Sequence, residues 1–128
     1  MKRREAREKA MQTLFQLDNT ELTVEEAISH VSEEKTSEFY EELVKGTAKN
    51  IQEIDDSLRT KLENWSLDRL PKIERTILRL AVYELLFMKD TPSKVVLNEA
   101  VELSKTFGDE QSSRFVNGVL SKYTEQHS

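Results

Sequence analysis

The chain has 128 residues, no cysteine and a formal net charge of −5 at pH 7. This length is that of one ordinary domain and is enough to bury a hydrophobic core. The lack of cysteine excludes disulfides, catalytic thiolates and thiolate metal sites. The acidic balance excludes a general attraction to nucleic acid, so any binding of nucleic acid has to be local.

The sequence shows neither a membrane-spanning segment nor a signal peptide. It contains no run of 18 apolar residues, and its basic start leads into an amphipathic pattern without a continuous apolar stretch or a cleavage site. We therefore expect an unprocessed cytoplasmic protein with no membrane partner. Because no repeat or linker is apparent, we expect one domain over residues 1–128.

The pattern of apolar residues predicts helices almost everywhere. Only three glycines and two prolines occur, too few turn-forming residues for a fold of many strands. Apolar residues recur at spacings of three and four, which is the period of an amphipathic helix. The fold class predicted is all-α, a compact domain of about six to seven helices.

Three helices are predicted in the first half of the chain. The first runs from about Arg3 to Leu17, with its apolar residues on one side. A short second helix begins at Thr23, where Glu26 completes a Thr-x-x-Glu capping box. The apolar stripe from Tyr40 to Trp65 predicts the longest helix of the chain. Gly46 interrupts this stripe, and we expect a neighbouring helix to come close there.

Three more helices are predicted in the second half. Pro71 suits a first helical turn, and the stretch Ile73 to Met88 is apolar nearly all round, which predicts the central helix of the fold. The next helix extends from about Pro92 to Phe107, and Gly108 is expected to end it in the left-handed conformation. The last helix holds the apolar residues of the stretch Phe115 to Tyr123.

The sequence offers little for catalysis. His30 and His127 are its only bases that titrate near neutral pH. Neighbouring residues on a helix point about 100° apart, so adjacent carboxylates form no dyad and are interpreted as solvated faces. The adjacent pairs are Glu25 with Glu26, Glu41 with Glu42, and Asp55 with Asp56. No metal-binding, phosphate-loop or nucleophile motif occurs. We expect no enzyme, no catalytic residue, no metal, no cofactor and no small-molecule substrate.

Positive charge gathers at the start of the chain. The stretch Met1 to Lys9 carries a charge of +3, whereas the remainder carries −8. At about 100° per residue, the arginines project on the same side as the apolar residues that follow. Guanidinium groups pair with phosphate and stack on bases, which favours an anionic partner such as RNA. The residues concerned are Lys2, Arg3, Arg4 and Arg7. A frayed, solvated terminus remains an open alternative.

Two further features are open to more than one interpretation. Phe15 offers an aromatic surface to RNA if it is exposed, and otherwise belongs to the core. Lys72, Arg75 and Arg79 fall at i, i+3 and i+7 on one helix face. This basic stripe either faces a partner or RNA, or pairs with carboxylates inside the protein. For Arg79, which lies between two leucines, we expect an internal ion pair.

Three blocks of sequence together resemble the NusB family of transcription antitermination factors. The first is Arg3-Arg4-Glu5-Ala6-Arg7-Glu8-Lys9-Ala10-Met11-Gln12-Thr13-Leu14-Phe15, and the second is Ile73-Glu74-Arg75-Thr76-Ile77-Leu78-Arg79-Leu80-Ala81-Val82-Tyr83-Glu84-Leu85. The third is Asn98-Glu99-Ala100-Val101-Glu102-Leu103-Ser104-Lys105-Thr106-Phe107-Gly108, followed by Phe115-Val116-Asn117-Gly118-Val119-Leu120. The blocks occur in the order of the family and extend the resemblance over essentially the whole chain.

The resemblance implies a fold and a function. NusB proteins consist of two small helical bundles packed across one another. They bind the single-stranded boxA element of nascent transcripts, notably ribosomal RNA leaders, together with NusE, a ribosomal protein of the small subunit. The assembly helps RNA polymerase to resist termination, so RNA polymerase is an indirect partner.

The resemblance also assigns residues. It places Arg3, Arg4 and Arg7 on RNA, while Lys2, Phe15 and Lys72 join them on charge and aromatic character. The block that contains Phe115 and Asn117 is expected near the same RNA surface, with Asn117-Gly118 at a tight helix approach. Glu74 and Arg75 match the edge expected near NusE. Glu5 stands where some relatives have a further arginine, so the isolated chain is expected to bind RNA weakly.

Two alternatives stay open at this stage. One is a NusB-like RNA-recognition module that acts without NusE, as in the domains that precede some RNA methyltransferases. The other is a helical adaptor, for example a homodimer, whose arginines bind an acidic protein surface.

Overall fold

The computed structural model describes residues 1–18, 20–31 and 36–125, and within these ranges all regular structure is helical. This confirms the all-α prediction. The α-helices are α1 (Arg3–Leu17), α2 (Val24–Val31), α3 (Glu38–Lys49), α4 (Ile51–Lys61), α5 (Lys72–Phe87), α6 (Ser93–Phe107) and α7 (Glu110–Glu125), with a 3-10 helix, η1, at Leu67–Arg69. None of the helices in these ranges is both long enough and apolar enough to cross a membrane.

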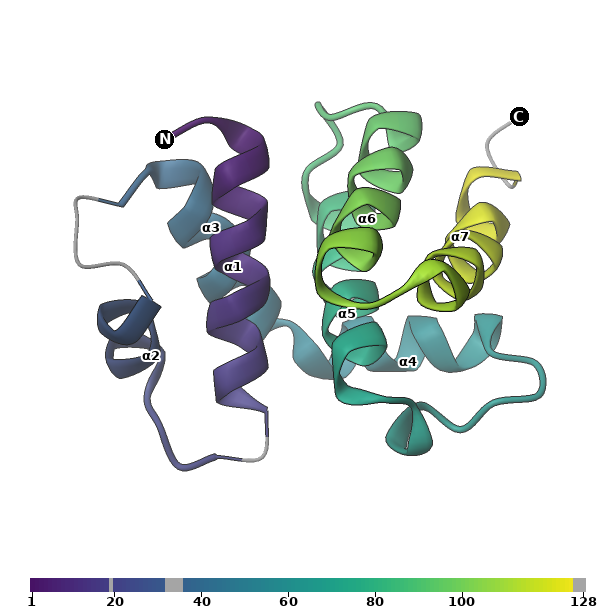
Figure 1. The fold of residues 1–128 in the computed structure, drawn as a ribbon, viewed down its shortest axis with the longest axis horizontal. Coiled ribbons are helices and arrows are strands. Elements are labelled where there is room, and N and C mark those ends of the chain that lie inside the picture. The colour runs from purple at the N-terminus through teal and green to yellow at the C-terminus, as the bar shows by residue number, and fades with distance from the viewer. Residues whose placement is uncertain (19, 32–35, 126–128) are drawn as a thin grey trace.

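The helices form two groups that share one central helix (Figure 1). In the first group α1 packs against α2 and α3, and in the second α6 packs against α7. Helix α5 contacts helices of both groups, and residues all round it are buried, as the apolar stretch predicted. The two small bundles that the family resemblance implied are therefore present, with α5 at their junction.

The long helix predicted from Tyr40 to Trp65 is wrong, because the chain breaks at Asn50. Both the backbone amide and the side-chain Nδ2 of Asn50 donate to the carbonyl of Gly46, at 3.0 and 2.8 Å. These two hydrogen bonds to one carbonyl mark the end of α3. From there α4 runs in a new direction toward the second bundle (Figure 1). Trp65 lies beyond the end of α4 and is 61% exposed, so it does not continue the buried stripe.

The first turn of α2 has the predicted capping box. The amide of Glu26 donates to the hydroxyl of Thr23 at 3.1 Å, and the Glu26 carboxylate accepts from the Thr23 amide at 3.3 Å. Two amides that the helix leaves without internal partners are thereby satisfied.

Three glycines were assigned special roles, and one of these assignments is confirmed. A Cβ added to Gly46 would lie 2.1 Å from the Tyr83 ring, so α3 and α5 meet there as expected. Gly108 has a φ of −119°, and the left-handed cap predicted for it is wrong. The tight approach predicted at Asn117-Gly118 is also wrong, because no atom lies within 4 Å of a Cβ added to Gly118.

The two helical glycines form a matched pair for a stability test. Gly46→Ala forces the Tyr83 ring or α3 to move, and we expect it to lower the free energy of unfolding by about 1–3 kcal/mol. Gly118→Ala meets open space and removes the entropic cost of glycine in a helix, so we expect a gain of about 0.5–1 kcal/mol. Urea unfolding followed by circular dichroism measures both. Equal effects of the two substitutions would contradict the close contact at Gly46.

Candidate nucleic-acid interface

The exposed cations of the N-terminus lie at the first turn of α1. Lys2, Arg3 and Arg4 are all exposed. The guanidinium of Arg3 lies over the ring of Phe39, 4.4 Å from its centroid, in a cation–π contact. Arg4 donates from Nε and Nη2 to the carboxylate of Glu99 on α6, at 3.2 Å each. These hydrogen bonds raise the pKa of Arg4. The terminus is therefore anchored to two neighbouring helices and is not a frayed end.

Arg7 differs from the other arginines of this turn because it is buried. Only 3% of Arg7 is exposed, and its Nε and Nη2 donate to the two carboxylate oxygens of Glu84 on α5, at 2.7 and 2.9 Å. A guanidinium held in this way has no free edge for a phosphate. The structure thus corrects the expectation that Arg7 contacts RNA, because Arg7 connects α1 to the central helix.

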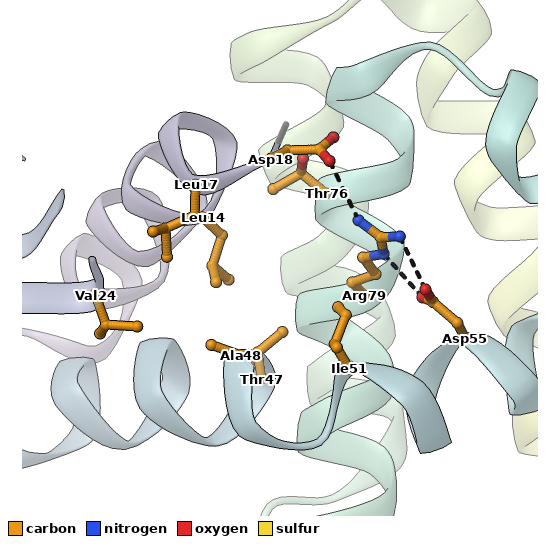
Figure 2. Close-up of a pocket in the computed structure, with 10 residues that line it drawn as sticks. All are labelled: Leu14, Leu17, Asp18, Val24, Thr47, Ala48, Ile51, Asp55, Thr76 and Arg79. Carbon is orange, nitrogen blue, oxygen red and sulfur yellow. Dashed lines mark hydrogen bonds and ion pairs between the residues drawn. The ribbon is translucent and has the colours of Figure 1, made fainter. Parts of the chain in front are cut away.

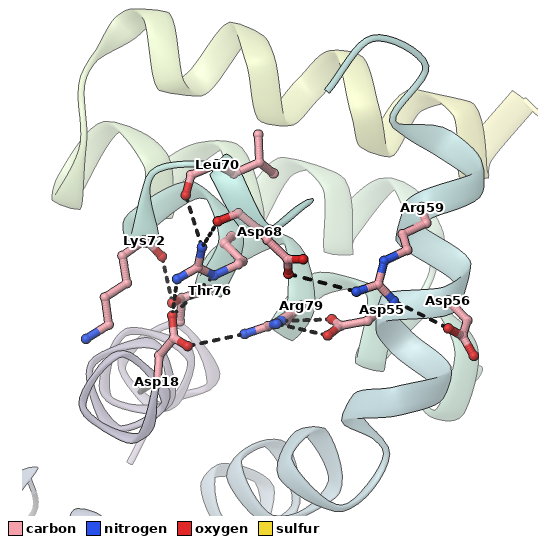
Figure 3. A network of polar contacts seen from close by, with 10 residues as sticks. Asp18, Asp55, Asp56, Arg59, Asp68, Leu70, Lys72, Thr76 and Arg79 are labelled. Atoms are coloured by element: carbon pink, nitrogen blue, oxygen red, sulfur yellow. Dashed lines mark hydrogen bonds and ion pairs between the residues drawn. The ribbon is translucent and has the colours of Figure 1, made fainter. Parts of the chain in front are cut away.

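Two cations of the basic stripe on α5 also form ion pairs inside the protein, and Figure 3 shows those of Arg79. Arg75 is 8% exposed, pairs with Asp18 and donates to two backbone carbonyls of the segment before α5. Arg79 donates to both carboxylate oxygens of Asp55 at 2.8 and 2.9 Å, which confirms its internal ion pair. The expected partner-binding role of Arg75 is corrected accordingly. Asp55, expected on a solvated face, is buried as the partner of Arg79.

The remaining cation of the stripe lies in a groove with the predicted aromatic residues. The groove has a volume of about 680 Å³ and lies where the end of α1, the start of α5 and the start of α7 meet. It is lined by Phe15, Trp65, Leu70, Pro71, Lys72, Ile73, Glu74, Gly108, Asp109, Gln111, Ser112 and Phe115. The structure therefore brings Phe15, Lys72, Glu74 and Phe115 together, although they come from three different helices.

Aromatic rings form the two ends of this groove. The Nζ atom of Lys72 lies 4.3 Å from the centroid of the Phe15 ring. The rings of Trp65 and Phe115 meet edge to face at 5.4 Å, with an angle of 74° between their planes. Phe15 and Phe115 are half-buried and not part of the closed core. The groove thus offers flat apolar surfaces beside a cation, which is the composition of a surface that binds single-stranded nucleic acid.

A set of hydrogen bonds fixes the start of α7 at this groove. The Asp109 carboxylate accepts from the backbone amide of Ser112 at 2.8 Å, and this hydrogen bond lowers the pKa of Asp109. The Ser112 hydroxyl in turn donates to Glu74 on α5 at 2.8 Å. Asp109 therefore caps α7, and Ser112 ties α7 to α5, so the position of Phe115 one turn further on is determined.

Asn117 lies outside the groove. It is exposed on α7, and at about 100° per residue it points roughly 200° away from Phe115. Trp65 was predicted to lie on a buried helix stripe, but it lines the groove instead. The one signal that could have marked Trp65 is its place after Asn64 and before Ser66, in a segment poor in helix formers.

A second cavity of about 420 Å³ lies between the two bundles (Figure 2). Leu14, Leu17 and Val24 line one end of it, and the ion pairs of Arg79 with Asp18 and Asp55 lie toward the other, next to Ile51. These charges satisfy one another, whereas the buried hydroxyl of Thr47 in the same lining has no hydrogen-bond partner among the described residues. Residues 1–18, 20–31 and 36–125 contain no cluster of acidic, histidine or cysteine side chains that could hold a metal ion. His30 is exposed on α2, and His127 lies outside the described residues.

The fold and this surface define an all-helical protein that carries a basic helix terminus and an aromatic groove on its surface. The model of the NusB family matches residues 4–125. The chain therefore belongs to the NusB family, as its three sequence blocks indicated.

Two relatives show how closely the chain follows the family. It is 69% identical over 126 residues to the transcription antitermination protein NusB of Lysinibacillus sphaericus (strain C3-41), with 98% of this chain and 99% of that protein covered. It is 51% identical over 122 residues to the protein of the same name from Bacillus subtilis (strain 168), covering 94% and 93%. Both relatives are named as antitermination proteins, which agrees with the expectation that the chain is not an enzyme.

Solved structures agree with the fold. NusB of T. maritima superposes with a TM-score of 0.88 at 36% identity, covering 98% of this chain and 92% of that one. A crystal structure of the antitermination factors NusB and NusE in complex with double-stranded RNA contains a chain with a TM-score of 0.86 and 35% identity, covering 97% and 96%.

The different surroundings of Arg7 and Arg3 predict different effects on stability. Arg7→Gln leaves Glu84 charged and buried without its partner, so we expect a loss of about 3–5 kcal/mol in the free energy of unfolding. Arg3→Gln changes an exposed side chain, and we expect an unchanged melting temperature. Thermal and urea unfolding of the two variants test this. If Arg7→Gln melted at the temperature of the unchanged protein, Arg7 would not have the structural role given to it here.

Proposed function

We propose that this protein is a cytoplasmic transcription antitermination factor that binds boxA-like single-stranded RNA jointly with NusE. The RNA is a nascent transcript, notably a ribosomal RNA leader, and RNA polymerase is engaged indirectly through the assembly. Family membership, and the presence of NusB, NusE and RNA together in the structure of a relative, support this proposal.

The observation that carries the proposal is the alignment of two features along α1. Arg4 and Phe15 are eleven residues apart, which is three helical turns, so both project from the same face of the helix. Their Cα atoms are about 16 Å apart along the axis. Helix α6 lies along the same side of α1. Its Glu99 pairs with Arg4, and its Phe107 lines one hollow together with Phe15. A basic end and an aromatic groove thus share one face of the protein.

This arrangement suits single-stranded RNA. Such RNA is usually bound by stacking bases on aromatic or guanidinium planes while cations follow its backbone. In our proposal Lys2, Arg3 and Arg4 pair with phosphates at one end, and Lys72 does so at the groove. Phe15 and Phe115 stack bases. Asn117 points away from the groove and is given no contact with the RNA there.

NusE is proposed to bind beside the groove, at the start of α5. Glu74 lines the groove there and is half-buried, with one carboxylate oxygen bonded to Ser112. Arg75 supports this edge from inside, because its bonds to Asp18 hold the start of α5 against the end of α1. A second protein that extends the RNA surface adds affinity that neither protein has alone.

Binding to boxA-like RNA and to a scrambled RNA, with and without NusE and across a salt series, tests the proposal. We expect a clear preference for boxA-like RNA when NusE is present. Of about four phosphate contacts, that of Arg4 should release little net salt because Glu99 loses its partner. The logarithm of the binding constant should therefore fall against the logarithm of salt concentration with a slope of roughly −2. Equal affinity for both RNAs in the presence of NusE would refute the antitermination role.

The N-terminal cations can be tested separately. Replacing Lys2, Arg3 and Arg4 with Gln should weaken RNA binding and flatten the salt slope by about 1.4. The contacts of Lys2 and Arg3 release salt ions, whereas that of Arg4 releases few, because Glu99 is left without its partner. A matched control replaces three other exposed lysines, Lys45, Lys49 and Lys89, with Gln. It lowers the net charge by the same amount as the first variant. Helicity and NusE binding should survive in both variants. If both weakened RNA binding alike, net charge and not this surface would be responsible.

A further inference from the structure

Trp65 is an exposed aromatic residue that the function proposed so far does not use. It is the only tryptophan of the chain, and 61% of it is accessible to solvent. Its ring meets the ring of Phe115 at an angle of 74°. Tryptophan is enriched at binding interfaces, because its large ring buries apolar area while its N–H stays available for a hydrogen bond.

A second hollow lies on the far side of Trp65. It measures about 260 Å³ and is formed by the end of α4, the segment that follows it and one face of α7. It shares Trp65 and Phe115 with the groove described above, so these two rings separate two neighbouring hollows. Gly118 also lines it, and because nothing lies within 4 Å of a Cβ built on Gly118, this part of the hollow stays open.

The second hollow is more basic than the groove. It is lined by Lys61, Arg114 and Lys122 against one carboxylate, that of Glu63. Lys122 lies 3.5 Å from the Glu63 carboxylate and donates to the carbonyl of Lys61 at 2.8 Å. Arg114 is exposed and forms no ion pair with another residue of the described ranges. An anion entering this hollow therefore finds an excess of two positive charges.

The groove itself has the opposite balance. Its lining includes one cation, Lys72, and two carboxylates, those of Glu74 and Asp109. An RNA strand in the groove would have its bases well accommodated but few of its phosphates neutralised. The adjoining hollow supplies the missing cations directly beyond the two rings.

We propose that single-stranded RNA leaving the groove continues over Trp65 into this second hollow. A base stacks on the exposed face of the Trp65 indole, and Arg114 and Lys122 pair with the phosphates on either side. This extension rests on the proposed function, since it begins where that RNA site ends. An aromatic plane flanked by cations is the pattern by which proteins hold single strands without reading each base.

Trp65 provides its own measurement because no other tryptophan contributes to the fluorescence of the chain. The protein is titrated with a core boxA-like RNA and with the same RNA extended by about four nucleotides at its 5′ or its 3′ end. One of the extended RNAs should quench the tryptophan fluorescence and bind about 10-fold more tightly than the core, as expected for one stacked base. If NusE alone changes the fluorescence and neither extended RNA does, Trp65 contacts a protein and the proposal is overturned.

Variants separate stacking from charge. Trp65→Leu keeps an apolar side chain against Phe115. It should abolish the gain from the extension, so that the variant binds the extended and the core RNA with equal affinity. Arg114→Gln should reduce the salt slope by about 0.7 for the extended RNA only. Lys89→Gln, an exposed lysine elsewhere, is the control and should change neither quantity. Unchanged melting temperatures establish that all three variants fold.

The outcomes distinguish this proposal from the function on which it rests. If the core RNA binds with boxA preference but the extension adds no affinity for the unchanged protein, the second hollow is not an RNA site and the proposed function stands. If even the core RNA shows no preference with NusE present, the proposed function fails and this extension fails with it.

Discussion

The ion pair between Arg7 and Glu84 fixes the position of α1 on the central helix, and the candidate RNA surface depends on it. Both groups are buried, and a buried charge is tolerated only when it is paired and hydrogen-bonded. Because the two bonds are bidentate, α1 can neither slide nor rotate without leaving a charge unpaired. This register turns Arg4 toward α6 and sets Phe15 beside Lys72.

A second connection holds the other end of α1. Asp18, directly after α1, pairs with Arg75 on α5. It also pairs with Arg79 on α5, which in turn pairs with Asp55 on α4 (Figure 3). The two bundles are thus joined by charges at both ends of α1 and by apolar packing between them. Arginine serves two purposes in this protein. Arg7, Arg75 and Arg79 connect helices of the scaffold, whereas Arg3 and Arg4 are exposed, where we propose that they bind RNA.

Much of the fold follows from the sequence, since the apolar period located α1, α5 and α6 and the Thr23 capping box located α2. The break at Asn50 was missed because the apolar stripe continues in the same period on both sides of it. The roles of Arg7 and Arg75 were missed because charge and spacing cannot tell an internal partner such as Glu84 from an external one. The groove required the structure, since its walls come from segments that are distant in the chain.

The ion pair between Arg4 and Glu99 has a consequence for how RNA can be gained and lost. If a phosphate of the proposed RNA pairs with Arg4, the salt cation that had neutralised this phosphate is released. Glu99 then lies beside the strand without its partner and attracts a salt cation in place of Arg4. The exchange therefore swaps one carboxylate for one phosphate, with little net release of salt ions. On this proposal Arg4 is a reversible contact. When the strand detaches, Arg4 pairs with Glu99 again, so neither side chain is left without an opposite charge.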